Sequence, residues 1–185
     1  MQKIIYNKQD FLVHKKNNNA FLEQLIENIY PYCNGIASRY AKTDEQANNH
    51  TKSCFLKTLK ILLDREEEEF DNTTFLKQFT ICVAKTILAE RKGERIADTT
   101  IVSSYKKKDT NLFAASEYYK TLTPNDLIQH LRKLNTLQQL IYNLICIDQF
   151  SLSETAEILE HNELSIKALL EKAKYNLFTS IKSIV

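Results

Sequence analysis

The chain has 185 residues and a formal net charge of +2, a length that suits one ordinary domain or two small ones. Only two glycines and two prolines occur, so the tight turns that strand-rich folds require are scarce, and we expect helices throughout. No apolar run approaches the roughly 18 residues of a membrane-spanning helix, and residues 1–10 lack the pattern of a signal peptide, so we expect a cytoplasmic protein without membrane insertion.

The N-terminal region begins with a short apolar patch, Phe11 to Val13, followed by lysines and asparagines, and we interpret residues 1–19 as a small extra element or a loose arm. A long helix is predicted over residues 22–40, because apolar residues recur there at helical spacing. Pro31 should kink or split this helix, since proline lacks the amide hydrogen that the helix requires. The residues expected to face inward are Leu22, Leu25, Ile26, Ile29, Cys33, Ile36, Ala37 and Tyr40.

Two further helices are predicted in the first half of the chain. Thr43-Asp44 should cap the first of them, and Asn72 or Thr73 should open the second. Between them Glu66–Glu69 carries four carboxylates in a row, which favours a solvated face or loop. The second helix ends in a basic cluster at residues 91–95. The expected inward residues are Ala47, Cys54, Phe55, Leu59 and Leu62 in one helix and Phe75, Phe79, Cys82, Val83 and Ile87 in the other.

Residues 96–122 lose this periodicity and are polar, which predicts a linker, since a loop of that length is unusual within a compact domain. Thr123-Pro124 then opens a helix with a cap and a first-position proline. Apolar residues that continue it and mark the next helix are Leu127, Leu131, Leu134, Leu137, Leu140, Ile141, Leu144 and Ile145. The sequence therefore predicts an all-α fold of two small helical domains, 1–95 and 123–185, joined by a flexible linker over 96–122.

The last two predicted helices form a closely spaced pair. Ser151 and Glu154 have capping-box spacing, and Asn162 suits the N-cap of the second helix after a three-residue turn. The second helix has a predicted buried stripe and lysines largely off that stripe. The stripe is Ile166, Leu170, Ala173 and Leu177, and the lysines are Lys167, Lys172 and Lys174. This pattern predicts a helix-turn-helix, whose second helix enters the major groove of DNA. An ordinary amphipathic hairpin with solvated lysines is the alternative.

The charge of the C-terminal domain is low for a protein that binds DNA by itself. Residues 125–185 hold six Lys or Arg and seven Asp or Glu, which gives a net charge of −1. An autonomous DNA-binding domain is usually distinctly basic. We therefore expect this domain to need a larger partner that supplies affinity.

The side chains suggest no catalytic or metal site. The cysteines and histidines are widely spaced, and no CxxC pair, glycine-rich phosphate loop or nucleophile elbow occurs. We interpret Cys33, Cys54, Cys82 and Cys146 as reduced core thiols. The prediction is a protein with no cofactor, no metal ion and no enzymatic activity.

Four blocks near the C-terminus carry a resemblance to a known protein family, and no gap is needed to align them. They are Leu134-Asn135, Glu154-Thr155-Ala156, Ser165–Leu170 and Lys172-Ala173-Lys174. With them the chain resembles, over residues 20–180, a small RNA polymerase sigma factor of the extracytoplasmic-function class. The resemblance implies that residues 123–185 act as the family's region four and read the minus-thirty-five promoter element. The implied DNA-binding residues are Glu163, Leu164, Ser165, Lys167, Ala168, Leu169, Lys172 and Lys174.

The N-terminal domain resembles the family's region two, which binds core polymerase and the minus-ten element. The implied polymerase-binding residues are Asn48, Asn49, Lys52 and Phe55. The implied residues for trapping the melted strand are Phe79, Lys85, Thr86, Glu90, Arg91, Lys92 and Arg95, in keeping with a basic face beside a base-holding pocket.

The chain departs from the family pattern at defined positions. Asn48 and Asn49 replace two acids, and Thr86 replaces an asparagine. Glu160 stands where the family has a turn glycine, and Leu169 replaces an outward arginine. Leu169 could touch a thymine methyl, although packing is the favoured interpretation.

The leading functional hypothesis is a sigma factor that binds core RNA polymerase and promoter DNA, with an anti-sigma inhibitor as a further partner. One alternative is a diverged sigma-like interaction module that binds polymerase or an inhibitor but reads promoters poorly. Another is an autonomous helix-turn-helix transcription regulator.

Overall fold

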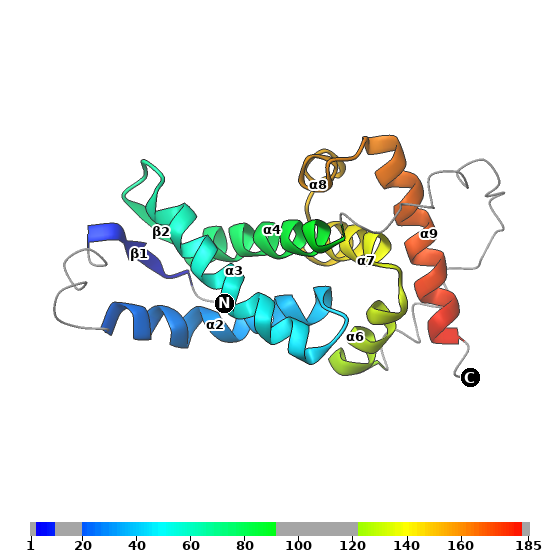
Figure 1. Ribbon diagram of the computed structural model, residues 1–185, viewed down its shortest axis with the longest axis horizontal. Helices are drawn as coiled ribbons and strands as arrows, with labels where there is room; N and C mark the ends of the chain where they lie inside the picture. The colour runs from blue at the N-terminus through cyan, green and yellow to red at the C-terminus, as the bar shows by residue number, and fades with distance from the viewer. Residues whose placement is uncertain (1–2, 10–19, 92–121, 183–185) are drawn as a thin grey trace. The chain divides into compact units, whose positions relative to one another are not determined.

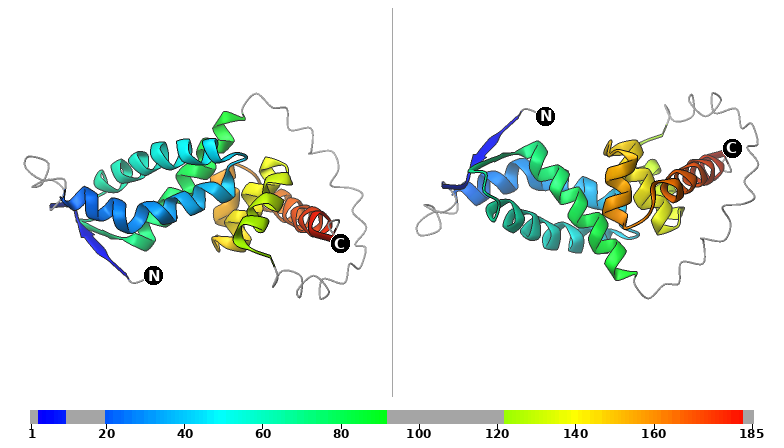
Figure 2. Two further views of the ribbon diagram at one scale, coloured as in Figure 1. Left: turned by 90° about the horizontal axis from the view of Figure 1, so that it is seen from below. Right: turned by 90° about the horizontal axis from the view of Figure 1, so that it is seen from above.

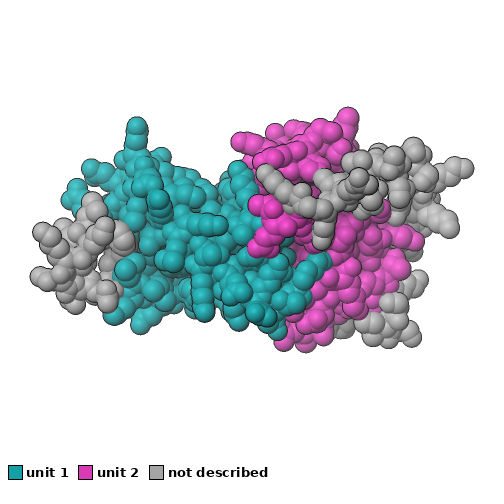
Figure 3. Space-filling model, viewed as in Figure 1, with its two compact units in different colours: residues 1–87 teal, residues 88–185 magenta. Residues whose placement is uncertain are grey.

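The structure is a computed structural model that describes residues 3–9, 20–91 and 122–182 (Figure 1). The apolar patch at 11–13 and the cations Lys92 and Arg95 lie outside these ranges. The predicted linker also lies outside them, except for its last residue. The chain divides into two compact units, residues 1–87 and 88–185 (Figure 3). Helices dominate the described residues of both units, which agrees with the predicted all-α class.

The first long helix, α2 (Ala20–Tyr40), runs through Pro31 without a break, so the split that proline was expected to cause does not occur. Pro31 is exposed, and on that side a carbonyl without its helical partner can bond to water. The predicted inward stripe is buried with two exceptions. Leu22 is half-buried, and Ile26 is 45% exposed because it lies beside the stripe that Leu25 and Ile29 define.

The next two helices begin where the sequence predicts. Thr43 caps α3 (Asp44–Leu63), and its side chain accepts a hydrogen bond of 3.1 Å from the Gln46 amide. The helix α4 (Asn72–Glu90) opens at Asn72. All ten residues predicted to face inward from α3 and α4 are buried. Helices α2 and α3 lie side by side in both views of Figure 2.

A two-stranded antiparallel ribbon joins the start of the chain to this helical unit. Strand β1 (Ile5–Asn7) pairs with β2 (Glu69–Asp71), with Tyr6 opposite Phe70. The small extra element predicted within residues 1–19 is thus a strand, and the last residue of the acidic run belongs to its partner. The rings of Tyr6 and Phe70 stack at 5.5 Å, and a row of aromatic contacts continues from them into the helical core. That row comprises Phe70–Phe75 at 6.2 Å, Phe75–Phe55 at 5.1 Å and Phe55–Tyr30 at 5.6 Å.

The second unit contains the four helical segments predicted after the linker. These are α6 (Pro124–Lys133), α7 (Thr136–Tyr142) with its π-helical continuation η2 (Asn143–Ile147), α8 (Leu152–Leu159) and α9 (Glu163–Lys182). Thr123 caps α6 in a capping box with Asp126. Helix α9 packs against α6, α7 and α8. One core cluster of the unit consists of Leu131, Leu134, Leu177 and Ile181.

The four thiols are free, and three of them lie in the core as predicted. Burial raises the pKa of the Cys33 and Cys54 thiols, so both remain protonated at neutral pH. Cys146 is exposed, and its assignment to the core was wrong. It lies on the solvent side of η2, whereas Asn143 and Leu144 are fully buried.

Candidate nucleic-acid interface

The interface begins with the cap of α8. The Ser151 hydroxyl accepts from the Glu154 amide at 3.1 Å, and a Glu154 carboxylate oxygen accepts from the Ser151 amide at 2.8 Å. This reciprocal pair is the predicted capping box. It fixes the start of α8 without help from the rest of the unit.

The turn between α8 and α9 is fixed at both of its ends. Glu160 takes a left-handed conformation, with φ 57° and ψ 40°, and the next amide, of His161, donates to the Ala156 carbonyl at 2.9 Å. At the other end Asn162 caps α9, because its Oδ1 accepts from the Ser165 amide at 2.8 Å. The direction in which α9 leaves α8 is therefore set by local hydrogen bonds.

The inner side of α9 is the predicted stripe. Ile166, Leu170, Ala173 and Leu177 are all buried, and Ile181 continues the stripe by another turn. The helix is 20 residues long, so it extends beyond Ser165–Lys174, the segment that contains its two blocks of family resemblance.

The outer side of α9 holds the predicted DNA-binding residues. Glu163, Leu164 and Lys167 are exposed, and Leu164 has 81% of its surface in solvent. The other predicted residues are half-buried, namely Ser165, Ala168, Leu169, Lys172 and Lys174. Lys174 forms an ion pair with Glu171 at 3.0 Å. The first turn thus presents a carboxylate and an apolar side chain, and the cations follow it.

The predicted polymerase-binding residues divide between surface and core. Asn48, Asn49 and Lys52 are exposed on α3, whereas Phe55 is buried among the aromatic residues of the unit. Leu56 lies on the exposed side and is 67% exposed. Sequence reasoning missed Leu56, although its spacing of four from Lys52 and seven from Asn49 places all three on one side of a helix.

The residues predicted to hold melted DNA lie on α4 and just after it. Lys85 and Glu90 are exposed, and Arg91 is half-buried. Thr86 is half-buried too, with its Oγ1 3.5 Å from the Cys54 sulfur. Phe79 is fully buried, so in this conformation its ring packs in the core. Within the described residues α4 therefore offers a polar outer side but no exposed aromatic ring from this set.

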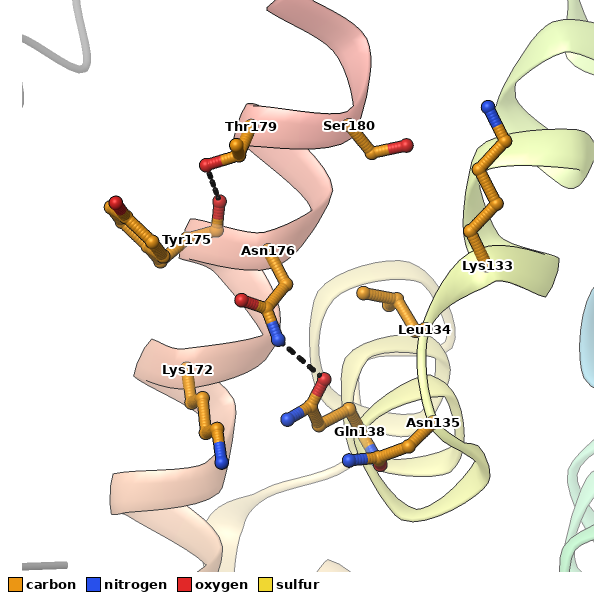
Figure 4. Close-up of a pocket in the computed structure, with 9 residues that line it drawn as sticks. All are labelled: Lys133, Leu134, Asn135, Gln138, Lys172, Tyr175, Asn176, Thr179 and Ser180. Carbon is orange, nitrogen blue, oxygen red and sulfur yellow. Dashed lines mark hydrogen bonds between the residues drawn. The ribbon is translucent and has the colours of Figure 1, made fainter. Parts of the chain in front are cut away.

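A cavity of about 500 Å³ opens in the second unit between the end of α6, the start of α7 and the C-terminal half of α9 (Figure 4). Its lining residues are Lys133, Leu134, Asn135, Gln138, Lys172, Tyr175, Asn176, Thr179 and Ser180. Asn176 donates to Gln138 Oε1 at 2.9 Å across the cavity wall. Only Lys172 of these residues was predicted as a site residue. Polar residues at 172, 176 and 179, one helical face of α9, are the signal that could have found it.

The parts of the chain that the structure describes contain no cluster of three or more metal-ligating side chains. Among the same residues, no helix has both the length and the apolar character needed to cross a membrane.

The chain has an all-α fold that is similar to that of a solved sigma-factor structure. That structure is the co-crystal structure of the sigma factor RpoE in complex with the anti-sigma factor NepR from Bartonella quintana. The TM-score is 0.54 at 16% sequence identity, and the match covers 89% of this chain and 98% of that chain. By sequence, the chain matches no protein-family model and no curated protein.

Proposed function

We propose that this protein is a specificity subunit of RNA polymerase that binds the core enzyme and directs transcription initiation at promoters. The observation that carries the proposal is the pair α8–α9, whose caps and left-handed turn residue fix how α9 projects. A rigid pair of this kind suits the presentation of one helix to a DNA groove. The sigma-like fold supports the same function.

In this proposal α9 contacts DNA mainly through phosphates. Its exposed first turn carries Glu163, which phosphates repel, and Leu164, which offers no charge. Lys167 is exposed one turn later and is the outermost of its predicted cations. Phosphate contacts position a protein on the duplex, and base contacts specify the sequence.

The first unit would supply the polymerase contact. Asn48, Asn49, Lys52 and Leu56 lie on one exposed side of α3, where three polar side chains are followed by an apolar one. Such a mixture is typical of a protein–protein interface with an apolar centre. Phe55 would contribute indirectly, by holding α3 against Phe75 of α4.

The outer side of α4 would face the melted strand. Lys85 and Arg91 are the cations of this region that the structure describes, and cations are needed beside single-stranded phosphates. Because Phe79 is buried, we assign it to the packing of α4 and not to stacking on a base.

The test is promoter-directed transcription with purified core polymerase, with and without this protein. We expect initiation at discrete start sites only when the protein is present, and no product from the protein alone, because we propose no catalysis of its own. Replacing Leu56 by Asp should reduce initiation together with binding to core, since it puts a charge in place of the apolar side chain of the contact. Replacing Glu157, which is exposed on α8, by Gln is the matched control and should leave both unchanged.

A second candidate is an interaction module that binds polymerase or an inhibitory protein without reading promoters well. It is favoured by the uncharged amides at Asn48 and Asn49, where the resembled family has acids, and by the acidic first turn of α9. An anti-sigma partner is part of this candidate, since the structural neighbour is described in complex with one. Binding to core without any initiation at promoters would support this second function over the first.

A further inference from the structure

The cavity beside α9 has a lining that favours anions. Its two charged side chains are cations, Lys133 from the end of α6 and Lys172 from α9. None of its nine lining residues carries a carboxylate. Lys133 is exposed and has no ion-pair partner among the described residues. An ammonium group placed this way is available to a ligand oxygen.

The wall of the cavity contains a buried amide. Gln138 is only 1% exposed, and its Oε1 accepts from Asn176 (Figure 4). Its Nε2, in contrast, is buried without an acceptor in the described parts of the chain. A buried donor left without an acceptor is unfavourable, so a ligand oxygen at this wall would be stabilised.

The hydroxyl groups of the lining are already engaged elsewhere. Thr179 donates to the Tyr175 carbonyl at 2.9 Å, and the Ser180 hydroxyl lies 2.9 Å from a ring nitrogen of His130. The lining groups that remain to hold a ligand without giving up another contact are therefore the Lys133 ammonium group and the Nε2 of Gln138. At the rim, Tyr175 adds an aromatic ring that is 40% exposed.

We infer that this cavity binds a phosphate group, supplied either by the backbone of a nucleic acid or by a small phosphorylated ligand. Two flanking ammonium groups and an amide wall match the charge and the acceptor oxygens of a phosphate. The volume of about 500 Å³ exceeds that of a phosphate alone and leaves room for an adjoining sugar or base beside Tyr175. An acidic peptide is less well matched, because Leu134 is the single aliphatic residue of the lining.

Lys172 connects the cavity with the proposed DNA-binding side of α9. Ser165, Leu169, Lys172 and Asn176 follow one another at spacings of three or four, so they lie along one side of the helix. A backbone contacted near the start of α9 could therefore continue into the cavity. This nucleic-acid source rests on the proposed function, whereas phosphate binding itself does not require polymerase or a promoter.

The experiment is a chemical-shift titration of the isotope-labelled full-length protein with pyrophosphate at constant ionic strength. We expect saturable shifts of the side-chain amide signals of Asn135, Gln138 and Asn176. The variants Lys133→Gln and Lys172→Gln should each weaken binding by about tenfold or more, as expected for loss of a charged hydrogen bond. The matched control is Lys60→Gln, which removes the same charge from an exposed position of α3 outside the cavity lining and should keep the parent affinity.

Competition then identifies the source of the phosphate. A short DNA duplex that displaces pyrophosphate, with a salt dependence that Lys133→Gln lowers by about one unit, indicates the nucleic-acid backbone. Pyrophosphate binding that the duplex leaves unchanged indicates a small phosphorylated ligand. Shifts that never saturate, or an equal loss of affinity in Lys60→Gln, would overturn the proposal, and so would an acidic peptide that saturates these signals when pyrophosphate does not. Failure of promoter-directed transcription would reject the proposed function without affecting these measurements.

Discussion

Glu160 occupies a backbone conformation that an ordinary side chain tolerates poorly. Its φ of 57° lies in the left-handed region, which glycine reaches without steric cost. Its carboxylate also lies at the C-terminus of α8, where the helix dipole disfavours negative charge. Both effects act on the turn that sets the direction of α9.

Replacing Glu160 by Gly should therefore stabilise the protein by about 0.5–1 kcal/mol, measured by urea denaturation. Glu157→Gly is the opposing control, because it introduces glycine inside α8 and should destabilise by about the same amount. A Glu160→Gly variant less stable than the parent would show that the Glu160 side chain makes a contact that outweighs the strain.

His130 is a buried titratable group that holds α6 against α9. Its Nδ1 lies 2.9 Å from the Ser180 hydroxyl. Burial lowers the pKa of His130 from its usual value, and Lys133 lowers it further, while Asp126 opposes both. The folded protein thus prefers the neutral ring, whereas the unfolded chain takes up a proton at the ordinary pKa near 6.5.

The contribution of the neutral His130 ring to the free energy of unfolding should consequently be fully present above about pH 6.5. It should decline as the pH falls from there toward the lower pKa of the folded state. The measurement is the melting temperature between pH 7.5 and 5.5, compared with a His130→Gln variant in which this decline is reduced. Asp126 does not confound the comparison, because hydrogen bonds from Thr123 lower its pKa and it titrates well below this window. The same decline in parent and variant would assign it to another group.

At the scale of the element, two leucines of α9 differ in environment, since Leu164 faces solvent and Leu170 faces the core. Leu170 is buried on the stripe that faces the rest of the unit, and Leu164 is largely exposed. Leu170→Ala should destabilise by roughly 2–5 kcal/mol through the cavity it leaves. Leu164→Ala should change stability by less than about 0.5 kcal/mol. Thermal melting of the two variants compares them directly, and equal melting temperatures would mean that α9 is rotated from the orientation described here.

Elements whose signals are local could be predicted from the sequence. The caps at Thr43, Thr123, Ser151 and Asn162 depend on a side chain and an amide three residues away, and all four form as expected. The buried stripes of α3, α4 and α9 follow equally from helical spacing. The turn residue Glu160 was recognised only through the glycine that the resembled family has there.

Features that depend on distant parts of the chain could not be predicted. Strand β1 exists because it pairs with residues more than sixty positions away. Ile26 and Cys146 are exposed because of what surrounds them and not because of their own type. The cavity combines Lys133 with residues of α9 some forty positions later, so no single window of the sequence contains it.

For the whole molecule, the net charge and the division into two units favour recognition of promoter DNA together with core polymerase over binding of DNA by the free protein. The C-terminal portion, residues 125–185, carries a net charge of −1, from six basic and seven acidic residues. Lys174, one of its few cations, is already paired with Glu171. A surface of this kind gains little from the counterion release that supports nonspecific binding to DNA.

We therefore expect tight promoter binding only in the presence of core polymerase. Two weak contacts, one from each unit, act together when a common partner fixes their spacing, because the second contact then forms at high effective concentration. The free protein should bind promoter DNA at roughly micromolar affinity or weaker at physiological salt. The measurement is a footprint on one promoter with the protein alone, with core alone and with both. Protection should appear with both together, and at two separated elements. Tight, sequence-specific protection by the free protein would contradict this expectation and indicate an autonomous helix-turn-helix regulator.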